Sequence, residues 1–339
     1  MRAAILTKYR KVDVKEIPEP QLGPHDILFR VMACGICPND YRLYAGFATW
    51  TRPPTTFGHE PSGVVVNVGC EVKSFKPGDK VAGDVTTRCG YCRYCASGRE
   101  NLCINRKSVG EWALAQLAAA NEIWMNKFHH ASFEEAALTE PLACVINGFK
   151  RSDVKAGGTV AIVGGGQIGL MHMQMAKLTG AETIVVDVRK DRLSVAKRLG
   201  ADHVIDSSSS SPVARVKELT SDGVDAVIVT IGNAQAIETG FQLASPTGSV
   251  NLFASTNPPT RVPIDPNVIH HGEISVVGSY DKTRSELREA TRLIDEGKID
   301  VKTLITQTYN LEQTTEALLD VERGRGVKVV VKPNPRGEG

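Results

Sequence analysis

Two patterns of apolar and polar positions divide the chain near residue 150. Before that point, short runs rich in β-branched residues are broken by Gly and Pro, as in residues 26–34, 62–69 and 78–85. Such runs are typical of short strands joined by turns. The first part of the chain is therefore predicted to be a Gly-rich, mostly β domain.

From Thr159 to about residue 280, apolar strand-like runs alternate with helix-like segments. This alternation predicts a doubly wound parallel sheet. Two helix-like segments, 285–299 and 311–324, and a last strand at 327–333 follow it, and we expect this tail to return to the first domain. The prediction is a two-domain α/β fold, in which residues 1–148, completed by 281–339, flank a nucleotide-binding domain at 149–280.

A glycine-rich loop follows the predicted strand 159–163. Gly164, Gly166 and Gly169 form a G-x-G-x-x-G motif that opens a helix, with Gln167 and Ile168 inside it. In such a loop the glycines permit a tight turn, a close approach to pyrophosphate and close helix packing, while helix N-terminal amides hold the anion. The motif predicts a dinucleotide site made by these five residues.

The cofactor is predicted from the acidic residue that ends the next strand. Asp187 lies eighteen residues beyond Gly169, where a carboxylate accepts hydrogen bonds from the ribose hydroxyls of NAD and repels the 2′-phosphate of NADP. Nearby basic residues, among them Arg189 and Arg192, would partly offset that repulsion. We therefore expect NAD, with Arg192 also at the cofactor site.

Four of the eight cysteines form one cluster with the spacing C-x2-C-x2-C-x7-C: Cys89, Cys92, Cys95 and Cys103. Four thiolates at this spacing converge on one zinc in a closed tetrahedral shell, which is typical of a structural site. An iron–sulfur site or paired disulfides are alternatives, because cysteine spacing alone does not fix the metal.

Composition narrows the class of protein. The 339 residues include 40 Lys and Arg against 38 Asp and Glu, and a formal net charge of +2 gives no field that favours nucleic acid or a membrane surface. No stretch approaches the roughly 18 apolar residues of a membrane span, and the N-terminus lacks a signal-peptide core. We expect a cytoplasmic enzyme without nucleic-acid or membrane partners, whose clustered cysteines bind metal.

Taken together, several motifs resemble the zinc-containing medium-chain dehydrogenases, the family of alcohol, sorbitol and threonine dehydrogenases. The resemblance covers nearly the whole chain. It is carried by the cysteine cluster, by the glycine loop and by residues 35–40, 57–65, 75–81 and 132–143. It implies a GroES-like mostly β catalytic domain, a Rossmann coenzyme domain, NAD, and two zinc ions per chain, one catalytic and one structural.

The resemblance also implies the ligands of the catalytic zinc. Cys37, His59 and Glu140 match the family's ligand positions, and Glu60 can bind the metal directly or exchange with substrate. One thiolate, one imidazole and carboxylates leave a position open for an alcohol. Asp40 matches the carboxylate that orients the imidazole of His59.

The chain departs from the family at the proton relay. Many relatives have Ser or Thr two residues after the ligand cysteine and a histidine three residues further, where this chain has Asn39 and Arg42. An amide cannot relay a proton. We expect Asn39 to contact substrate or water and Glu60 or Glu140 to replace the relay, with Tyr44 a weaker candidate.

The acidic third ligand and residues 265–283 resemble the sorbitol branch of the family more than they resemble the simple alcohol dehydrogenases. The expected reaction is oxidation of a secondary alcohol of a polyol, sugar or cyclitol, a small-molecule substrate. A threonine or short-chain secondary alcohol dehydrogenase is the alternative, and so is a non-catalytic nucleotide-binding member. We further expect a homo-oligomer, with a tetramer favoured over a dimer. The pairs His129-His130 and His270-His271 are expected to lie in loops.

Overall fold

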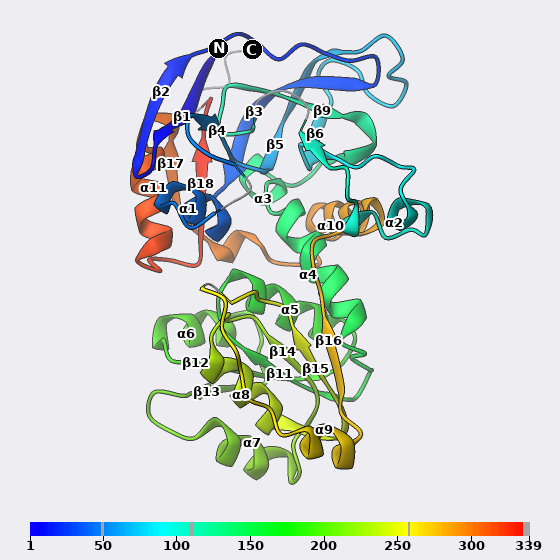
Figure 1. The fold of residues 1–339 in the computed structure, drawn as a ribbon, viewed down its shortest axis with the longest axis vertical. Coiled ribbons are helices and arrows are strands. Elements are labelled where there is room, and N and C mark those ends of the chain that lie inside the picture. Colours follow the sequence, from blue (N-terminus) through cyan, green and yellow to red (C-terminus); the bar gives the residue numbers. More distant parts are fainter. Residues whose placement is uncertain (49–50, 109–111, 257, 335–339) are drawn as a thin grey trace. The chain divides into compact units, whose positions relative to one another are not determined.

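The computed structural model describes residues 1–48, 51–108, 112–256 and 258–334 (Figure 1). The chain divides into two compact units. Unit 1 joins Met1–Ala143 to Lys282–Gly339, and unit 2 is Cys144–Asp281. No helix within the described ranges is long and apolar enough to cross a membrane.

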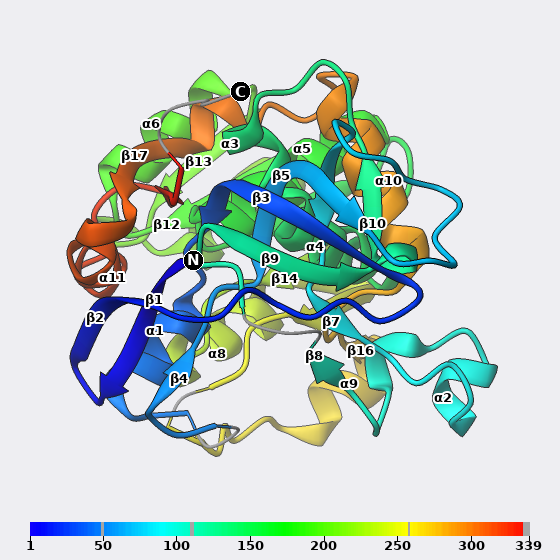
Figure 2. The ribbon, with the colours of Figure 1, turned by 90° about the horizontal axis from the view of Figure 1, so that it is seen from above.

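A seven-stranded sheet organises unit 1, in the order β10-β6-β5-β3-β18-β17, with β9 also paired to β3. Its strands are β3 (Asp26–Gly35), β5 (Glu60–Val68), β6 (Lys80–Gly83), β9 (Leu117–Asn121), β10 (Met125–Lys127), β17 (Ile305–Asn310) and β18 (Lys328–Lys332). Figure 2 shows β3 between β5 and β9. Because β18 pairs with β3, the tail of the chain joins the sheet that the first part of the chain forms.

Smaller elements surround this sheet. A three-stranded sheet contains β1 (Arg2–Lys8), β2 (Lys11–Glu16) and β4 (Thr55–Thr56), and a two-stranded one pairs β7 (Thr86–Thr87) with β8 (Lys107–Ser108). The helices are α1 (Pro38–Ala45), α2 (Arg93–Ala96), α3 (Phe133–Ala136), α10 (Arg284–Asp295) and α11 (Thr314–Glu322). The longer helix α4 (Thr139–Arg151) begins in unit 1.

A six-stranded, wholly parallel sheet forms the centre of unit 2, in the order β13-β12-β11-β14-β15-β16. Its strands are β11 (Thr159–Val163), β12 (Glu182–Asp187), β13 (His203–Asp206), β14 (Val224–Val229), β15 (Ala244–Leu252) and β16 (Ser275–Gly278). Successive strands run outward in one direction from β11 and, from β14, in the other. Ligands bind outside the carboxyl ends of such strands, where the order reverses.

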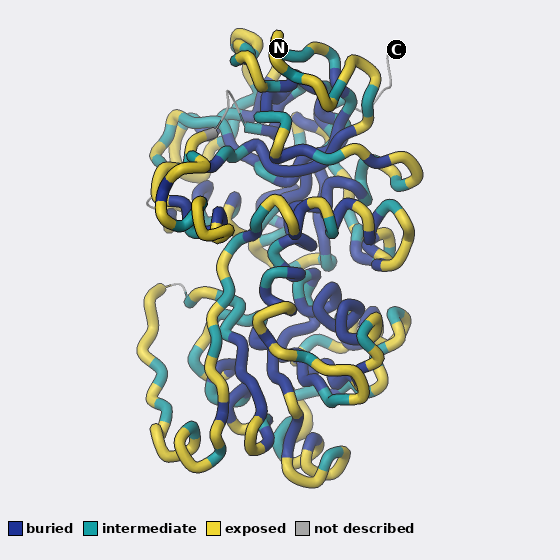
Figure 3. The backbone as a smooth tube through the Cα atoms, turned by 90° about the vertical axis from the view of Figure 1, so that its right-hand side faces the viewer, coloured by how far each residue is buried: buried dark blue, intermediate teal, exposed yellow. Residues whose placement is uncertain are grey.

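Helices connect the strands of unit 2: α5 (Gln167–Leu178), α6 (Lys190–Arg198), α7 (Pro212–Thr220), α8 (Ala234–Leu243) and α9 (Pro266–Gly272). The inner strands are buried nearly throughout, which is the condition of a parallel sheet with both faces covered (Figure 3). The continuous apolar runs in the sequence thus have a direct structural cause.

One local prediction was wrong: His270 and His271 lie in helix α9, not in a loop. The side chain of Asp265 accepts a hydrogen bond from the backbone N–H of Asn267 at 2.9 Å, and Pro266 occupies the first helical position. A capping side chain followed by proline is a helix start signal. The helix was missed because its seven residues are too few to show a helical period.

His172, in α5 of unit 2, is completely buried and packs edge-on against Phe253, with ring centroids 4.9 Å apart. Within the described part of the chain, neither of its ring nitrogens has a hydrogen-bond partner. Burial lowers the pKa of His172 to about 3 from an ordinary value of 6.5. The folded chain therefore keeps this imidazole neutral at pH values where the unfolded chain protonates it.

We expect His172 to make the protein less stable in acid. Between pH 6.5 and 3 the unfolded state binds a proton that the folded state does not, so the free energy of unfolding falls as pH falls. The slope from one such group is at most about 1.4 kcal/mol per pH unit. Urea unfolding at pH 6.5 and pH 5 should show a drop for the wild type that is up to about 2 kcal/mol larger than for His172→Leu.

The exposed His271 provides the matched control, because His271→Leu should leave the pH dependence of the wild type unchanged. Parallel pH profiles for the wild type and His172→Leu would show that His172 is protonated, or partnered, in the folded state.

Candidate metal centre and nucleotide loop

Cys37 stands at the N-cap of α1, at the end of β3. Pro38 fits the first helical turn, and the Asp40 carboxylate accepts a hydrogen bond from the backbone N–H of Cys37 at 2.8 Å. This local pattern starts the helix at a fixed residue. Burial raises the pKa of the Cys37 thiol above its ordinary value, and the nearby His59 opposes that shift. The thiolate is the form that would bind a metal.

Asp40 also faces His59. Its Oδ1 lies 3.4 Å from Nδ1 of His59, and the Asp40 side chain is buried. Burial lowers the pKa of His59, but Asp40 and Cys37 outweigh that effect and hold the pKa well above 6.5. The placement of Asp40 is the one expected of a carboxylate that orients a metal-binding imidazole.

Glu60 is the first residue of β5 and is paired in register with Gly35 of β3. Its Oε2 accepts a hydrogen bond from the ammonium of Lys328 in β18, which also donates to the carbonyl of Ile36 at 3.0 Å. Any Cβ at Gly35 would collide with the Glu60 carboxylate and lie 2.8 Å from Cε of Lys328. Glycine at position 35 therefore makes room for this buried ion pair.

The ligand atoms of Cys37, His59 and Glu60 all lie within 4.8 Å of one another. Among the described residues, Oε1 of Glu60 is a buried oxygen without a hydrogen-bond partner. Burial raises the pKa of Glu60, and Lys328 opposes this shift. A thiolate, an imidazole and an unsatisfied carboxylate oxygen at this spacing fit a zinc ion held by three protein ligands.

Glu140, in the first turn of α4, lies close enough to raise the pKa of Glu60. Its own carboxylate accepts a hydrogen bond from the buried ammonium of Lys282. Among the residues that the structure describes, Glu140 does not belong to the group formed by Cys37, His59 and Glu60. The direct ligation expected of Glu140 thus stays a prediction.

Asn39 is exposed on α1, and its Oδ1 accepts a hydrogen bond from Arg42 at 3.2 Å. The two residues at the family's relay positions thus contact each other. Tyr44 is only 4% exposed and belongs to the apolar core of unit 1, which leaves it poorly placed to accept a substrate proton. Of the residues expected to accept the substrate's hydroxyl proton, Glu60 and Glu140 remain as candidates.

The sulfur atoms of Cys89, Cys92, Cys95 and Cys103 lie within 4.8 Å of one another. Backbone amides point at these sulfurs, including Cys92 N to Cys89 Sγ and Cys89 N to Cys103 Sγ, both at 3.3 Å. Amides of Cys95 and Ile104 lower the pKa of Cys92 to about 6. The donor set fits one zinc bound by four thiolates in a closed shell.

In unit 2 the glycine loop joins β11 to α5. Gly164 has a φ of +112°, which favours glycine, and Gly166 is the N-cap of the helix that begins with Gln167 and continues through Ile168. A Cβ at Gly169 would collide with the carbonyl of Gly164. Gly164 and Gly169 therefore occupy places where a side chain is excluded, and a Cβ at Gly166 would meet only the guanidinium of Arg192, at 4.0 Å. This geometry fits a pyrophosphate-binding turn.

Asp187 ends β12 and is 2% exposed. Its Oδ2 accepts a hydrogen bond from Gly165 N at 2.7 Å, and its Oδ1 accepts one from Arg189 N at 2.8 Å. The guanidinium of Arg192 lies 3.7 Å from the same carboxylate, beside Gly166. The structure thus brings Asp187 and Arg192 together at the glycine loop.

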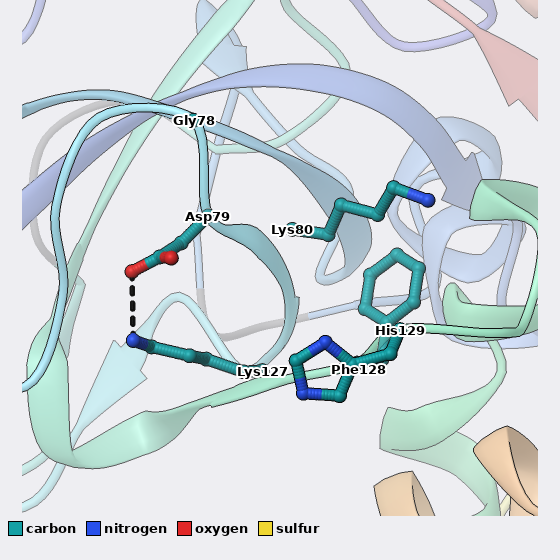
Figure 4. Close-up of a pocket in the computed structure, with 6 residues that line it drawn as sticks. All are labelled: Gly78, Asp79, Lys80, Lys127, Phe128 and His129. Atoms are coloured by element: carbon teal, nitrogen blue, oxygen red, sulfur yellow. Dashed lines mark ion pairs between the residues drawn. The ribbon is translucent and has the colours of Figure 1, made fainter.

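A separate cavity of about 230 Å³ in unit 1 is lined by Gly78, Asp79, Lys80, Lys127, Phe128 and His129 (Figure 4). Asp79 and Lys127 form an ion pair across it at 2.8 Å. None of the predicted ligands or loop residues lines this cavity. We assign it no part in the chemistry.

Sequence reasoning missed two buried lysines, Lys282 and Lys328, which neutralise the acidic residues of the metal centre. Lys328 is only 1% exposed, but its sequence signal was weak, because it is one of two lysines that bound the apolar run 329–331. Lys282 follows an aspartate in a polar segment and offered no comparable signal.

Comparison with known families gives two matches along the chain. Residues 23–130 match the alcohol dehydrogenase GroES-like domain, and residues 168–296 match the zinc-binding dehydrogenase family. The first match contains Cys37, His59, Glu60 and the cysteine cluster, and the second begins within the glycine loop.

Individual proteins are similar over nearly their whole length. The chain is 34% identical to a sorbitol dehydrogenase of Halalkalibacterium halodurans, covering 94% of this chain and 95% of the relative. It is 32% identical to an L-threonine 3-dehydrogenase of Symbiobacterium thermophilum, covering 95% and 94%. A zinc-binding dehydrogenase structure from Sinorhizobium meliloti bound to NADP is 32% identical, with a TM-score of 0.91 and coverage of 98% and 99%.

Proposed function

We propose that this chain, which belongs to the zinc-binding dehydrogenase family, oxidises a secondary alcohol of a polyol, sugar or cyclitol to a ketone with NAD as hydride acceptor. Membership of the family and the predicted two-domain α/β fold are confirmed. The observation that carries the proposal is the group of Cys37, His59 and Glu60, with Oε1 of Glu60 left unsatisfied.

In this proposal Cys37, His59 and Glu60 hold one zinc, and the four clustered cysteines hold a second. A zinc at the first site supplies Lewis acidity that favours loss of the substrate's hydroxyl proton. Asp40 fixes the orientation of His59, and Lys328 fixes that of Glu60. The substrate's C–H hydrogen leaves as hydride to the nicotinamide of NAD, and the hydroxyl proton is released to solvent.

The substrate class rests on similarity to proteins named sorbitol dehydrogenase, and threonine dehydrogenases are nearly as similar. The test is NAD reduction with sorbitol, arabitol, myo-inositol, L-threonine and 2-butanol. We expect the highest kcat/KM with a polyol or cyclitol. A higher value with L-threonine or 2-butanol would favour the alternative dehydrogenases. No turnover with any alcohol, at full zinc content, would favour a non-catalytic nucleotide-binding protein.

We predict that NAD is preferred over NADP by about tenfold or more in kcat/KM, which corresponds to about 1.4 kcal/mol. The Asp187 carboxylate is held by Gly165 and Arg189 and cannot turn away from a 2′-phosphate. Repulsion between unit charges about 4 Å apart reaches ~4 kcal/mol near a protein surface. Steady-state kinetics with both cofactors measure the ratio.

Two variants measure separately how the charges of Arg192 and Asp187 affect the cofactor preference. Arg192→Leu should increase the preference for NAD, because Arg192 is the cation that lies beside Asp187. Asp187→Ala should reduce that preference. Equal efficiency with NAD and NADP in the wild type would show that Arg192 outweighs Asp187, and the cofactor assignment would then be wrong.

We also propose a homo-oligomer, a tetramer rather than a dimer, located in the cytoplasm. Strand β16 is at the edge of the six-stranded sheet, and Val276 on it and Val268 on the neighbouring α9 are exposed. An unpaired apolar edge favours pairing with another chain. The location is supported by the four thiolates of the cysteine cluster, which persist in a reducing compartment.

A further inference from the structure

Helix α6 begins just after β12, the strand that Asp187 ends (Figure 1). Arg189 is the N-cap residue of this helix, and its backbone N–H donates a hydrogen bond to Oδ1 of Asp187 at 2.8 Å. A carboxylate in the position of Asp187 accepts hydrogen bonds from the adenosine ribose of NAD. The backbone of Arg189 therefore contacts the same carboxylate that the proposed cofactor would contact.

The guanidinium of Arg189 is bound by Asp191. Its Nε donates a hydrogen bond to Oδ1 of Asp191 at 3.0 Å, and its Nη2 donates one to Oδ2 at 2.5 Å. Two parallel hydrogen bonds of this kind fix the orientation of the guanidinium as well as its distance. These bonds raise the pKa of Arg189 and lower the pKa of Asp191, so both groups stay charged.

Asp191 is anchored independently of Arg189. It lies in the first turn of α6, where the helix N-terminus stabilises a negative charge. A hydrogen bond from the backbone of Arg192 also lowers the pKa of Asp191. Asp191 therefore offers the guanidinium of Arg189 an anion at a fixed place on the helix.

The two arginines that the sequence placed near the cofactor have different partners. Nη1 of Arg192 lies 3.7 Å from Oδ2 of Asp187, the oxygen that also accepts a hydrogen bond from Gly165 of the glycine loop. Arg192 therefore faces the carboxylate at the loop. By contrast, Nε and Nη2 of Arg189 face the carboxylate of Asp191 on α6.

We infer that Asp191 is a positioning residue that keeps the guanidinium of Arg189 away from a 2′-phosphate and so strengthens the preference for NAD over NADP. The inference rests on the proposed function, since it requires the adenosine ribose to bind at Asp187. Asp187 repels the 2′-phosphate directly. Asp191 acts through Arg189, because an NADP molecule that recruited this guanidinium would have to break its two bonds to Asp191.

The size of the effect follows from the exposure of the ion pair. The side chain of Arg189 is 33% exposed and that of Asp191 is 58% exposed. Exposed ion pairs of this kind change an equilibrium by about fivefold at most. Breaking the pair should therefore weaken the binding of NADP by about two- to fivefold, while the binding of NAD is unaffected.

The test measures the Kd of NAD and of NADP for the whole chain by isothermal titration calorimetry, which requires no turnover. Asp191→Asn keeps an oxygen acceptor at the helix start but removes the charge that binds Arg189. The ratio of the Kd of NADP to the Kd of NAD should fall by about two- to fivefold in this variant. Asp191→Glu keeps a carboxylate and should retain the wild-type ratio.

A double variant separates an effect through Arg189 from direct repulsion by Asp191. The Kd ratio of Arg189→Leu/Asp191→Asn should equal that of Arg189→Leu alone, because Asp191 has no guanidinium to hold in either protein. Glu218→Gln is the matched control, since Glu218 pairs with Arg215 on α7 and is also 58% exposed. It changes the net charge by the same amount and should keep the wild-type ratio.

Three outcomes overturn the inference. An unchanged ratio in Asp191→Asn would show that Asp191 does not keep Arg189 from the 2′-phosphate. An equal fall in the ratio with and without Arg189 would show that Asp191 repels the phosphate directly. In both cases NAD still binds and the proposed function stands. A wild type that binds neither nucleotide would overturn the proposed function as well, which distinguishes the two failures.

Discussion

Replacing Cys37 or His59 by alanine is expected to reduce turnover by about 10³-fold or more while the fold stays intact, because a Lewis-acid metal contributes several kcal/mol and each ~1.4 kcal/mol is tenfold. Both side chains converge with Glu60 within 4.8 Å, and neither belongs to the large apolar core of unit 1. Zinc content should fall by one ion per chain. Turnover, zinc analysis and circular dichroism measure the three quantities.

Cys34→Ala is the matched control for Cys37→Ala. Cys34 lies three residues earlier, belongs to the apolar core of unit 1, and donates a hydrogen bond from its Sγ to the carbonyl of Gly35 at 3.6 Å. That variant should keep its zinc and its turnover. Turnover above a tenth of the wild-type value in Cys37→Ala or His59→Ala would show that the ligands are wrongly assigned.

Cys95→Ser is expected to lower stability far more than activity per folded molecule. The four sulfurs of the cysteine cluster lie together on short elements, α2 and its flanking turns, which bury little apolar surface. Binding of structural zinc is worth about 10–16 kcal/mol in isolated zinc-finger peptides, and we expect a loss of several kcal/mol here. Thermal unfolding and zinc content per chain check this.

Cys70→Ser provides the comparison, since Cys70 is exposed and lies outside the cluster. It should unfold at the wild-type temperature with its zinc content unchanged. If Cys95→Ser also retained the wild-type unfolding temperature, the cluster would not be a structural metal site.

The features that sequence predicted well are those encoded by neighbouring residues. The glycine loop and the cysteine cluster each depend on residues a few positions apart. The fold class followed from the change between two periodicities near residue 150, and it is confirmed. The roles of the individual site residues remain predictions.

The charge balance of the metal centre could not be read from the sequence. Lys328 lies 268 positions from Glu60, and Lys282 lies 142 positions from Glu140. Such pairs exist only because β18 returns to β3 and the segment before α10 reaches the start of α4. The family motifs identified both glutamates, but their lysine partners are brought to them only by the fold.

The helix that contains His270 is another feature that the sequence did not predict. Asp265 and Pro266 form a helix start, but the helix has only seven residues, which are too few to show a helical period. The structure adds the hydrogen bond from the backbone N–H of Asn267 to Asp265 that caps this helix.

Zinc-dependent alcohol oxidation by this chain is tested most directly by removing and restoring the metal while turnover of the best substrate of the panel is measured. We predict two zinc ions per chain in the native protein. A chelator should remove the zinc of Cys37, His59 and Glu60 first, and NAD reduction should fall in proportion to that loss and return when Zn²⁺ is added. Full activity in protein that has lost this zinc would contradict the account.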